Sequence, residues 1–292
     1  MKNYCTLSDK KYLKQGLALI RSLKKVTPES QIITQVPIPP YTFYYLCMDD
    51  ETYEALEGED VVRIRLSEVE KSRPEILEYK NKKAYNEYCW SLASTFCRFL
   101  LERKMLTNIL YIDSDIYFYQ DPAIIYDELG QKSIGIIRHR HNTSFSPDGE
   151  YNVGIIYFKN DEDGLSCLKW WNDCILKESR PELATCGDQK YLEEFVPVWG
   201  DSVCVLDKTF AHGAPWNFRL YVYDNYFTNG TVIWGDKEQP LVFNHFSKFR
   251  IDSENTIDPF SGQYADHTLN FQVLNIAEVK HFYMEYSKEF LN

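Results

Sequence analysis

Residues 109–119 read Ile109-Leu-Tyr-Ile-Asp-Ser-Asp-Ile-Tyr-Phe-Tyr119, an apolar run that ends in two carboxylates and resumes as an apolar and aromatic stretch. The run predicts a buried strand that carries Asp113 and Asp115 to the edge of a sheet. The two residues lie on the same side of an extended chain, roughly 6.6 Å apart at the backbone, so their oxygens can bind one hard divalent cation. We therefore expect a site for a metal ion or a phosphate here. The alternative is that the carboxylates only cap the end of the strand.

A second Asp-x-Asp pair, Asp161 and Asp163, stands in a different context. It lies in the polar stretch Lys159-Asn-Asp-Glu-Asp-Gly164. Polar residues followed by glycine favour a solvated turn, in which carboxylates face water. We therefore interpret the second pair as loop residues and the first pair, Asp113 and Asp115, as the functional one.

The bulk composition indicates a globular protein. The 292 residues are 44% hydrophobic and 26% charged, with a net charge of −11 and no long run of lysine and arginine. This charge argues against nucleic acid as a partner, because binding its backbone needs a concentrated positive face. No segment has a signal-peptide core or the ~18 apolar residues that span a bilayer, so we expect a cytoplasmic protein. The eight cysteines show no C-x-x-C spacing and are expected to be buried, reduced thiols.

Strands and helices alternate through the first 130 residues. Apolar periodicity predicts strands at 3–7, 43–48, 61–66 and 109–112, and helices at 10–26, 50–57, 68–83 and 86–104. Pro37, Pro39 and Pro40 exclude a helix at 31–41 and suit a loop or an edge extension. Such alternation is typical of an α/β fold with a mostly parallel sheet and right-handed crossovers.

After residue 130 the pattern changes to short strands, polar loops and aromatic segments. Strands are expected at 133–139 and 153–158, and helices at 164–177, from about 187, and at 271–290. No repeat or flexible linker divides the chain, which favours a single domain. We expect residues 1–130 to bind a nucleotide, residues 131–270 to shape a second substrate's site, and residues 271–292 to form a C-terminal helix. The mixed charge of that helix favours packing on the domain over lying on a membrane surface.

Other polar residues stand near strand ends, where ligands of an open α/β sheet bind. Asn152 and Gly154 lie where a polar loop enters a strand, and they either face the cleft or form a structural turn. Asp188 and Gln189 open an expected helix, at which Asp188 either binds a ligand or caps the helix.

Two histidine-containing segments are further candidates. His245 follows an apolar strand and precedes Lys248, so the imidazole could complete a metal shell and the ammonium could neutralise phosphate. A structural histidine is the alternative. The segment Arg138-His-Arg-His141 is interpreted as an exposed basic loop rather than a second metal site, with acceptor contact by His139 as the intermediate possibility.

Six segments occur in a fixed order along most of the chain. They are Tyr4-Cys-Thr-Leu7 with Tyr12-Leu-Lys-Gln-Gly-Leu-Ala-Leu19, Tyr111-Ile-Asp-Ser-Asp-Ile-Tyr-Phe118, Tyr151-Asn-Val-Gly154, Gly187-Asp-Gln-Lys-Tyr-Leu192, Ala214-Pro-Trp-Asn217 and Phe243-Asn-His-Phe246. In this order they resemble a bacterial group of nucleotide-diphospho-sugar transferases, which is similar in motifs to family eight of the glycosyltransferases. The resemblance implies a single Rossmann-like domain of the type-A glycosyltransferase fold, with a mixed, mostly parallel central sheet.

The resemblance also implies roles for individual residues. A Mn²⁺ or Mg²⁺ ion would be held by Asp113, Asp115 and His245. The remaining implied positions are Thr6 and Asp9 near the base and ribose, Arg98 near the sugar phosphate, Asn152 and Asp188 at the sugar hydroxyls, Gln189 at the reacting carbon, and Trp216 and Asn217 on the acceptor side. From the residues themselves we expect Gly154 to let the donor approach the backbone, and we count His139 as an acceptor-side candidate. One departure concerns donor binding by Lys248: family eight follows its late histidine with a glycine and a Lys-Pro-Trp, whereas this chain has His245-Phe-Ser-Lys-Phe249.

The implied activity is a hexosyltransferase type of reaction. A sugar would move from a nucleotide-diphosphate donor to a saccharide or glycolipid acceptor, in bacterial surface polysaccharide assembly in the cytoplasm or in peripheral contact with the inner face of the membrane. A cation would stabilise the charge of the leaving diphosphate. With retention, which the resemblance suggests, the leaving phosphate can accept the acceptor's proton, whereas inversion needs a base, for which Asp188 is the leading candidate.

Two other functions stay open at this point. A phosphatase-type enzyme with an aspartyl nucleophile would use the same Asp-x-Asp pair, but Tyr117 and the mid-chain position of the pair disagree with that pattern. A carbohydrate-binding protein without catalysis would explain the abundant aromatic residues, but not the ordered acidic, amide and imidazole motifs.

Overall fold

The strand before Asp113 lies in the middle of the central sheet of this computed structural model. The sheet has seven strands in the order β10 (Val203–Val205), β8 (Ile134–Arg138), β9 (Tyr151–Lys159), β6 (Asn108–Ile112), β1 (Lys2–Ser8), β4 (Tyr41–Cys47) and β5 (Val62–Arg65). The structure describes residues 1–28, 31–33, 36–38, 40–140, 149–251, 257–258 and 276–291.

All strands of the central sheet except β9 run in one direction. β1 pairs in parallel with β4 and β6, β4 with β5, and β8 with β10, whereas β9 pairs antiparallel with β6 and β8. The predicted α/β fold with a mixed, mostly parallel sheet is therefore confirmed. Because β9 is reversed, its first residues lie at the same edge of the sheet as the last residues of β6 and β8.

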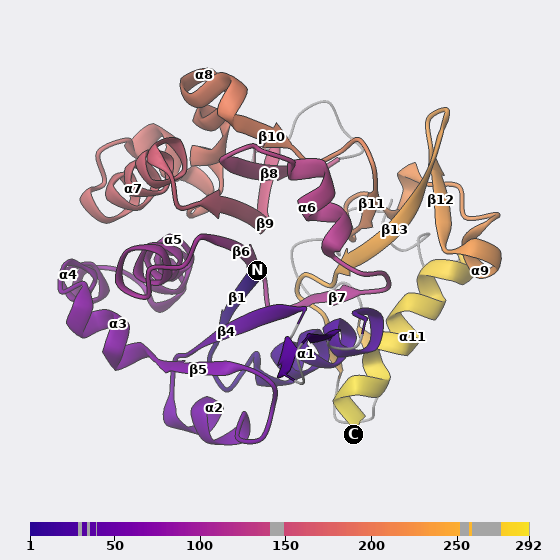
Figure 1. Cartoon of the computed structure of the whole chain (residues 1–292), viewed down its shortest axis with the longest axis horizontal. Helices are drawn as coiled ribbons and strands as arrows, with labels where there is room; N and C mark the ends of the chain where they lie inside the picture. The colour runs from indigo at the N-terminus through magenta and orange to yellow at the C-terminus, as the bar shows by residue number, and fades with distance from the viewer. Residues whose placement is uncertain are drawn as a thin grey trace.

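Helices cover both faces of this sheet. One face packs against α1 (Leu13–Val26), α2 (Asp50–Ala55) and α6 (Ala123–Leu129), and the other against α3 (Leu66–Ser72), α4 (Glu75–Lys82), α5 (Tyr85–Arg103), α7 (Glu162–Lys177) and α8 (Phe195–Trp199). In Figure 1, α5 and α7 lie to one side of the strands, and α1 and α6 to the other. No helix in these described ranges is long and apolar enough to cross a bilayer.

The apolar run of β6 is continuous because both of its faces are covered. Ile109 and Tyr111 belong to the core on the α5 side, and Leu110 and Ile112 to the core on the α1 side. Successive side chains of a strand point to opposite faces, so a strand between two helical layers needs apolar residues at every position. The run therefore fixes β6 at the centre of the fold.

A second, smaller sheet joins the later part of the chain to the end of β6. Its central strand, β13 (Lys237–His245), pairs in parallel with β11 (Ala211–Gly213) and antiparallel with β12 (Thr231–Trp234) and β7 (Ile116–Phe118). β7 begins directly after Asp115, and its Ile116 lies opposite His245. The pairing of β7 with β13 thus brings His245 beside the two aspartates.

The remaining elements are short. They are the strand pairs β2 (Gln31–Ile33) with β3 (Val36–Ile38) and β14 (Arg250–Ile251) with β15 (Ile257–Asp258), helix α9 (Tyr226–Asn229), and 3-10 helices at Pro181–Cys186, Lys190–Glu194, Gly200–Ser202 and Phe218–Leu220. The central sheet takes strands from both sides of residue 130, and the division of the chain into a nucleotide half and an acceptor half stays a prediction.

The C-terminal helix α11 (Ala277–Leu291) packs on the domain, as its mixed charge suggested (Figure 1). It contacts α1, where Lys25 forms an ion pair with Glu285 at 2.7 Å. On its inner face Tyr286 stacks on Phe246 with ring centroids 4.0 Å apart. The helix therefore supports the segment that follows His245. Residues 271–275 of the expected helix lie outside the described residues.

Two helix predictions were wrong in detail. The polar stretch 68–83 is not one helix, because it is divided at Pro74 into α3 and α4. No helix begins at Gly187, which instead adopts a φ of +66° between two 3-10 helices. Such a φ suits glycine and interrupts a helix, so residues 187–189 form a tight turn.

The cysteines agree with their interpretation as buried thiols. Cys5, Cys47, Cys97, Cys167, Cys174 and Cys204 are free and buried, and Cys89 is free and partly exposed. The sulfur atoms of Cys5 and Cys97 lie 3.9 Å apart between β1 and α5. The six buried cysteines belong to the two core clusters, and the potential metal-binding group found among the described residues contains no cysteine.

His212 of β11 has an unusual environment. Its ring stacks on Phe243, with centroids 5.4 Å apart, and its Nε2 is buried without a hydrogen-bond partner. Burial, followed by the nearby charge of Arg140, lowers the pKa of His212 well below 6.5. The folded protein thus holds a neutral imidazole, whereas the unfolded chain takes up a proton below about pH 6.5.

This environment predicts a pH-dependent contribution to stability. The contribution of His212 is complete above pH 6.5 and is lost as the pH falls, because the unfolded state then binds the proton. We expect His212→Gln to destabilise the protein at pH 8, and the deficit to shrink by about 1.4 kcal/mol per pH unit below pH 6.5. Urea unfolding of both proteins from pH 8 to pH 5 measures the difference, and a deficit independent of pH would contradict the assignment.

Candidate active site

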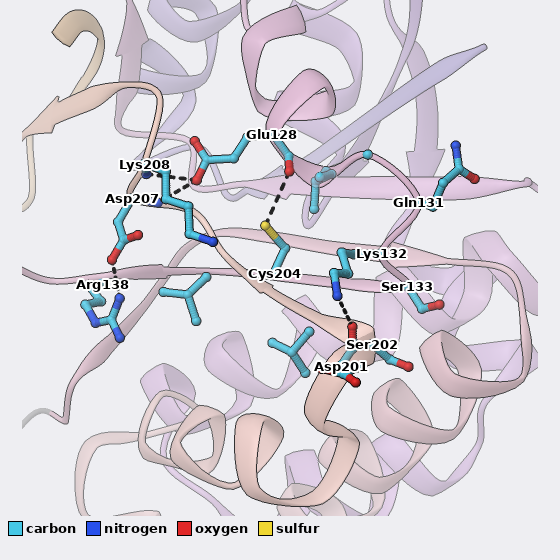
Figure 2. A pocket seen from close by; sticks show the side chains of 14 residues that line it. Glu128, Gln131, Lys132, Ser133, Arg138, Asp201, Ser202, Cys204, Asp207 and Lys208 are labelled. Carbon is cyan, nitrogen blue, oxygen red and sulfur yellow. Dashed lines mark hydrogen bonds and ion pairs between the residues drawn. The ribbon is translucent and has the colours of Figure 1, made fainter.

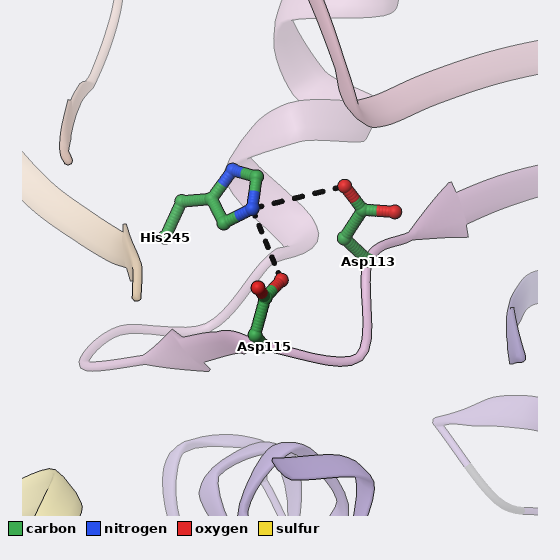
Figure 3. A group of neighbouring side chains, drawn as sticks. All are labelled: Asp113, Asp115 and His245. Carbon is green, nitrogen blue, oxygen red and sulfur yellow. Dashed lines mark ion pairs between the residues drawn. The ribbon is translucent and has the colours of Figure 1, made fainter. Parts of the chain in front are cut away.

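Three potential metal ligands meet beyond the end of β6. Figure 3 shows the carboxylates of Asp113 and Asp115 pointing toward the imidazole of His245. The Nε2 atom of His245 lies 3.0 Å from Oδ1 of Asp115 and 3.7 Å from Oδ2 of Asp113. Within the described residues, this is the one group of three acidic, histidine or cysteine side chains close enough to share an ion.

Backbone hydrogen bonds hold the turn that carries the aspartates. The amide of Asp113 donates to the carbonyl of Gly154 at 2.9 Å, and the amide of Phe246 donates to the carbonyl of Asp115 at 2.9 Å. The turn is therefore fixed on one side to β9 and on the other to the end of β13. The hydroxyl of Tyr111 donates to Oδ1 of Asp113 at 2.9 Å, which orients that carboxylate.

The electrostatics of the three groups favour a positive partner. Burial, and next to it the charge of Asp115, raises the pKa of Asp113 to about 6, although His245 acts in the opposite direction. Burial lowers the pKa of His245, but Asp115 and Asp113 outweigh it and leave the pKa above its ordinary value. Two clustered carboxylates thus retain a proton or a cation between them.

The donor set fits a divalent cation of the Mn²⁺ or Mg²⁺ type. Two carboxylates and one imidazole suit such ions. Neighbouring ligands of an octahedral ion with bonds of ~2.1 Å are about 3 Å apart, and the observed separations of 3.0 and 3.7 Å from His245 need little adjustment. Both aspartates keep a further oxygen, so the three side chains could hold an ion and leave positions for phosphate.

Asn152, Gly154 and Gln189 form a polar network beside this cluster. The amide Nδ2 of Asn152 donates to Oε1 of Gln189 at 2.9 Å, and its Oδ1 accepts from the amide of Gly154 at 2.8 Å. Gly154 is also adjacent to the metal ligands, because a Cβ placed there would lie 3.0 Å from Nδ1 of His245. These residues lie together beside the metal ligands, and whether they bind a ligand or form a structural turn stays a prediction.

His139, Trp216 and Asn217 extend the network. The Nε2 of His139 lies 3.2 Å from Nδ2 of Asn152, and its carbonyl accepts from Nε1 of Trp216 at 2.8 Å and Nδ2 of Asn217 at 3.0 Å. The ring of Trp216 contacts those of both His139 and His245, with centroids 5.4 Å apart in each case. Trp216, which the resemblance assigns to the acceptor side, therefore adjoins the metal cluster, and Asn217 and His139 lie beside it.

The interpretation of 138–141 as an exposed basic loop was wrong for its described residues. His139 and Arg140 are both buried. The guanidinium of Arg140 donates to the hydroxyl of Tyr221 and to the carbonyls of Asp207 and Phe210. These neutral acceptors replace the water molecules that an exposed guanidinium would bind. The charge pattern of the sequence does not show that such acceptors are available to Arg140. His141 lies outside the described residues.

Asp188 is buried close to Asp113. Burial, followed by the charge of Asp113, raises the pKa of Asp188 well above its ordinary value. Its carbonyl accepts from Nε1 of Trp171 at 2.9 Å, which anchors the turn to α7. Asp188 does not cap the following 3-10 helix, which begins with no side-chain cap. The capping alternative is therefore excluded.

Thr6 and Asp9 lie at the end of β1 and just beyond it. The hydroxyl of Thr6 is buried and has no hydrogen-bond partner among the described residues. Asp9 accepts through Oδ1 from the amides of Lys11 and Tyr12, and through Oδ2 from the hydroxyl of Tyr85 at 2.9 Å. Their assignment to the base and ribose stays a prediction.

Arg98 lies between two helices, and Lys248 follows the strand that ends at His245. Arg98 forms ion pairs with Glu102 at 2.8 Å and Asp173 at 3.0 Å, between α5 and α7. Lys248 follows β13 with a φ of +61°, a strained value for a residue other than glycine. The donor-binding roles of both residues stay predictions, and for Arg98 the ion pairs must first open.

The second acidic pair has a structural role, but it lies at the start of a helix rather than in the solvated turn that we expected. Asp161 is the N-cap of α7, where its Oδ1 accepts from the amide of Gly164 at 3.0 Å. Asp163 lies in the first turn of the same helix and bonds to Ser202. A capping role explains both carboxylates without a metal.

A pocket of about 720 Å³ lies elsewhere, between α6 and the edge strand β10 (Figure 2). Lys132 and Lys208 line it, as do Arg138 and Asp207, which form an ion pair with each other. Glu128 accepts from the amides of residues 207–209 and so closes one end. None of the predicted site residues lines this pocket.

Tyr111 is a site residue that the sequence reasoning overlooked. It orients Asp113 through its hydroxyl, as described above. Tyr111 lies two positions before Asp113 in a strand, so the two side chains share a face. The alternation that placed Asp113 and Asp115 together would have found it.

Solved structures define the class of fold. Mouse xyloside xylosyltransferase 1 matches with a TM-score of 0.55 and 13% identity, over 85% of this chain and 98% of the mouse chain. The galactosyltransferase LgtC, in complex with donor and acceptor sugar analogues, matches with a TM-score of 0.53 and 12% identity, over 96% of this chain and 95% of LgtC. The chain therefore has the type-A glycosyltransferase fold, as the resemblance implied.

Sequence comparison defines the family. Residues 42–285 match the nucleotide-diphospho-sugar transferase family. The chain is 30% identical to the uncharacterized proteins YfnF and YfnD of Bacillus subtilis (strain 168), over 87% and 73% of its length and over 84% and 70% of theirs. The chain belongs to the nucleotide-diphospho-sugar transferases. It is a glycosyltransferase that uses a nucleotide-activated sugar, and the narrower likeness to family eight stays a prediction.

The tight packing around Gly154 generates a prediction. A Cβ at this position would lie 2.5 Å from Oδ1 of Asn152 and 3.0 Å from Nδ1 of His245. We expect Gly154→Ala to lower the free energy of unfolding by about 1–3 kcal/mol, because the added methyl group overpacks the site. Adding Asn152→Ala removes the closer contact and should recover part of the loss. Chemical denaturation measures both, and strictly additive effects would contradict the contact.

Proposed function

We propose that the chain transfers a sugar from a nucleotide-diphosphate donor in a metal-dependent reaction that retains anomeric configuration. The convergence of Asp113, Asp115 and His245 beyond β6 carries this proposal. A bound Mn²⁺ or Mg²⁺ would stabilise the charge that develops on the leaving diphosphate. The acceptor is proposed to be a saccharide or glycolipid of a bacterial surface polysaccharide.

The neighbouring polar groups are proposed to position the donor sugar. Asn152 and Asp188 would bind its hydroxyls, and Gln189 would lie near the reacting carbon. Asn152 is already oriented by hydrogen bonds to Gln189 and Gly154, so little ordering is needed when a sugar binds. Trp216, Asn217 and His139 would border the acceptor, since Trp216 contacts His245 and both Trp216 and Asn217 donate to the carbonyl of His139.

The state of Asp188 favours retention over inversion. Inversion requires an ionised carboxylate to take the acceptor's proton. Both burial and the charge of Asp113 favour the protonated form of Asp188. A protonated carboxyl donates a hydrogen bond to a sugar oxygen, so the leaving phosphate is the better proton acceptor. The family membership also favours transfer over the phosphatase and the non-catalytic sugar-binding alternatives.

The two Asp-x-Asp pairs provide a matched test of the metal site. We expect Mn²⁺ to raise the melting temperature of the wild-type protein, because binding to the folded state stabilises it by mass action. Asp115→Asn should abolish the rise and lower donor turnover by about 10²–10³-fold. Asp163→Asn, in the pair that caps α7, should leave both unchanged. Equal responses of the two variants would refute the proposal.

The stereochemistry of the product tests the retaining mechanism. We expect the anomeric proton of the newly transferred sugar to show the same configuration as in the donor, measured by NMR before any equilibration. A product of the opposite configuration would assign the reaction to inversion and make Asp188 the general base.

A further inference from the structure

The first turns of α5 border the proposed donor site at two points. Tyr85, the first residue of the helix, donates its hydroxyl to Oδ2 of Asp9 at 2.9 Å. Trp90, about one turn later, lies against Gly187 of the turn that carries Asp188 and Gln189. This end of α5 thus reaches from the segment assigned to the nucleotide to the segment assigned to the sugar.

The contact between Trp90 and Gly187 fixes the indole against the backbone. A Cβ on Gly187 would lie 2.7 Å from Cε3 and 2.9 Å from Cδ2 of Trp90. Distances this short leave no room for a side chain, and the φ of +66° independently favours glycine. The six-membered ring of the indole therefore lies close to Gly187, and its position is tied to that of the turn that carries Asp188 and Gln189.

The indole is also incompletely covered. Trp90 is 44% exposed, whereas Trp171 on the neighbouring α7 is fully buried. An indole held on one side and open on the other presents a rigid apolar surface with little entropic cost of binding. The negatively polarised face of an aromatic ring attracts the C–H groups that line the apolar side of a sugar ring.

We propose that Trp90 is a specificity-determining residue whose indole packs on the donor sugar, while Asn152 and Asp188 bind the sugar's hydroxyls. This inference rests on the proposed function of the site. Trp90 would add an aromatic surface to the amide and carboxyl groups proposed to bind the donor sugar. The indole would favour sugars that present a continuous C–H face toward α5.

Binding of each nucleotide sugar is compared with binding of the same nucleotide diphosphate without the sugar. This comparison separates a sugar contact of Trp90 from a purely structural role. The probes are UDP-glucose, UDP-galactose, GDP-mannose and dTDP-rhamnose, each paired with UDP, GDP or dTDP, in the presence of Mn²⁺. Titration calorimetry gives the dissociation constants for the wild type, Trp90→Leu and Trp90→Phe. Leucine keeps apolar volume without an aromatic face, whereas phenylalanine keeps the face. Phe227→Ala, at an exposed aromatic residue on α9, is the control.

We expect Trp90→Leu to weaken binding of the preferred nucleotide sugar by ~3–10-fold, and Trp90→Phe by less than ~2-fold. Binding of the corresponding sugar-free nucleotide should be unchanged in both, and the control should match the wild type. Equal losses for both ligands, or none for the sugar-containing one, would overturn the role of Trp90. If the wild-type protein bound the nucleotide diphosphates but none of the nucleotide sugars, the proposed function itself would fail. That outcome differs from a failure of the role of Trp90, in which the wild type binds a nucleotide sugar and the variants bind it equally well.

Discussion

The pairing of β7 with β13 is the interaction on which the site depends. β7 follows Asp115 without a gap, and its three residues pair with the last three of β13. This short antiparallel ladder places His245 beside the Asp-x-Asp turn by regular pairing. Without the pairing of β7 with β13, this ladder would no longer fix the position of His245 relative to Asp113. The two carboxylates of the turn would then lack the imidazole as a neighbour.

Several other features support that pairing. The amide of Phe246 bonds to the carbonyl of Asp115, and the ring of Phe246 stacks on Tyr286 of α11. The terminal helix α11 thus packs against the segment after β13, and the β7–β13 ladder fixes the strand that precedes this segment. On the opposite side, Gly154 of β9 accepts from Asp113 and leaves room for His245. The small size of residue 154 is as necessary to the cluster as the ligands themselves.

The sequence predicted the central features of the fold because they depend on local chemistry. The run at 109–112 is apolar on both faces, and only a strand between two helical layers accommodates it. The same alternation placed Asp113 and Asp115 together, and the polar context of Asp161 and Asp163 distinguished the two pairs. Motif order then added His245, Asn152 and Gln189. In the structure His245 lies with the two aspartates and Asn152 bonds to Gln189, and the roles of these residues stay predictions.

The errors arose where distant segments meet. Arg140 is charged and follows a strand, yet three carbonyl or hydroxyl groups from residues 67–81 positions away bury it. The helix that carries Trp90 was predicted, but the contact of its indole with Gly187 was not, because a turn almost a hundred residues later sets that contact. Hydrophobic periodicity indicates which side of a helix or strand is buried. It does not indicate which distant segment of the chain packs against that side.

The separation of the paired strands along the chain has a consequence for the order of assembly. The sheet strands β1, β4, β5 and β6 all precede residue 113, whereas the third member of the ligand cluster arrives with residue 245. Contacts between residues so far apart in the sequence form late in folding. The entropic cost of closing a large loop must be met before such contacts stabilise the folded state. A growing chain on the ribosome therefore completes these four strands before the cluster can exist, and the three side chains can share an ion only after residue 245 has been synthesised.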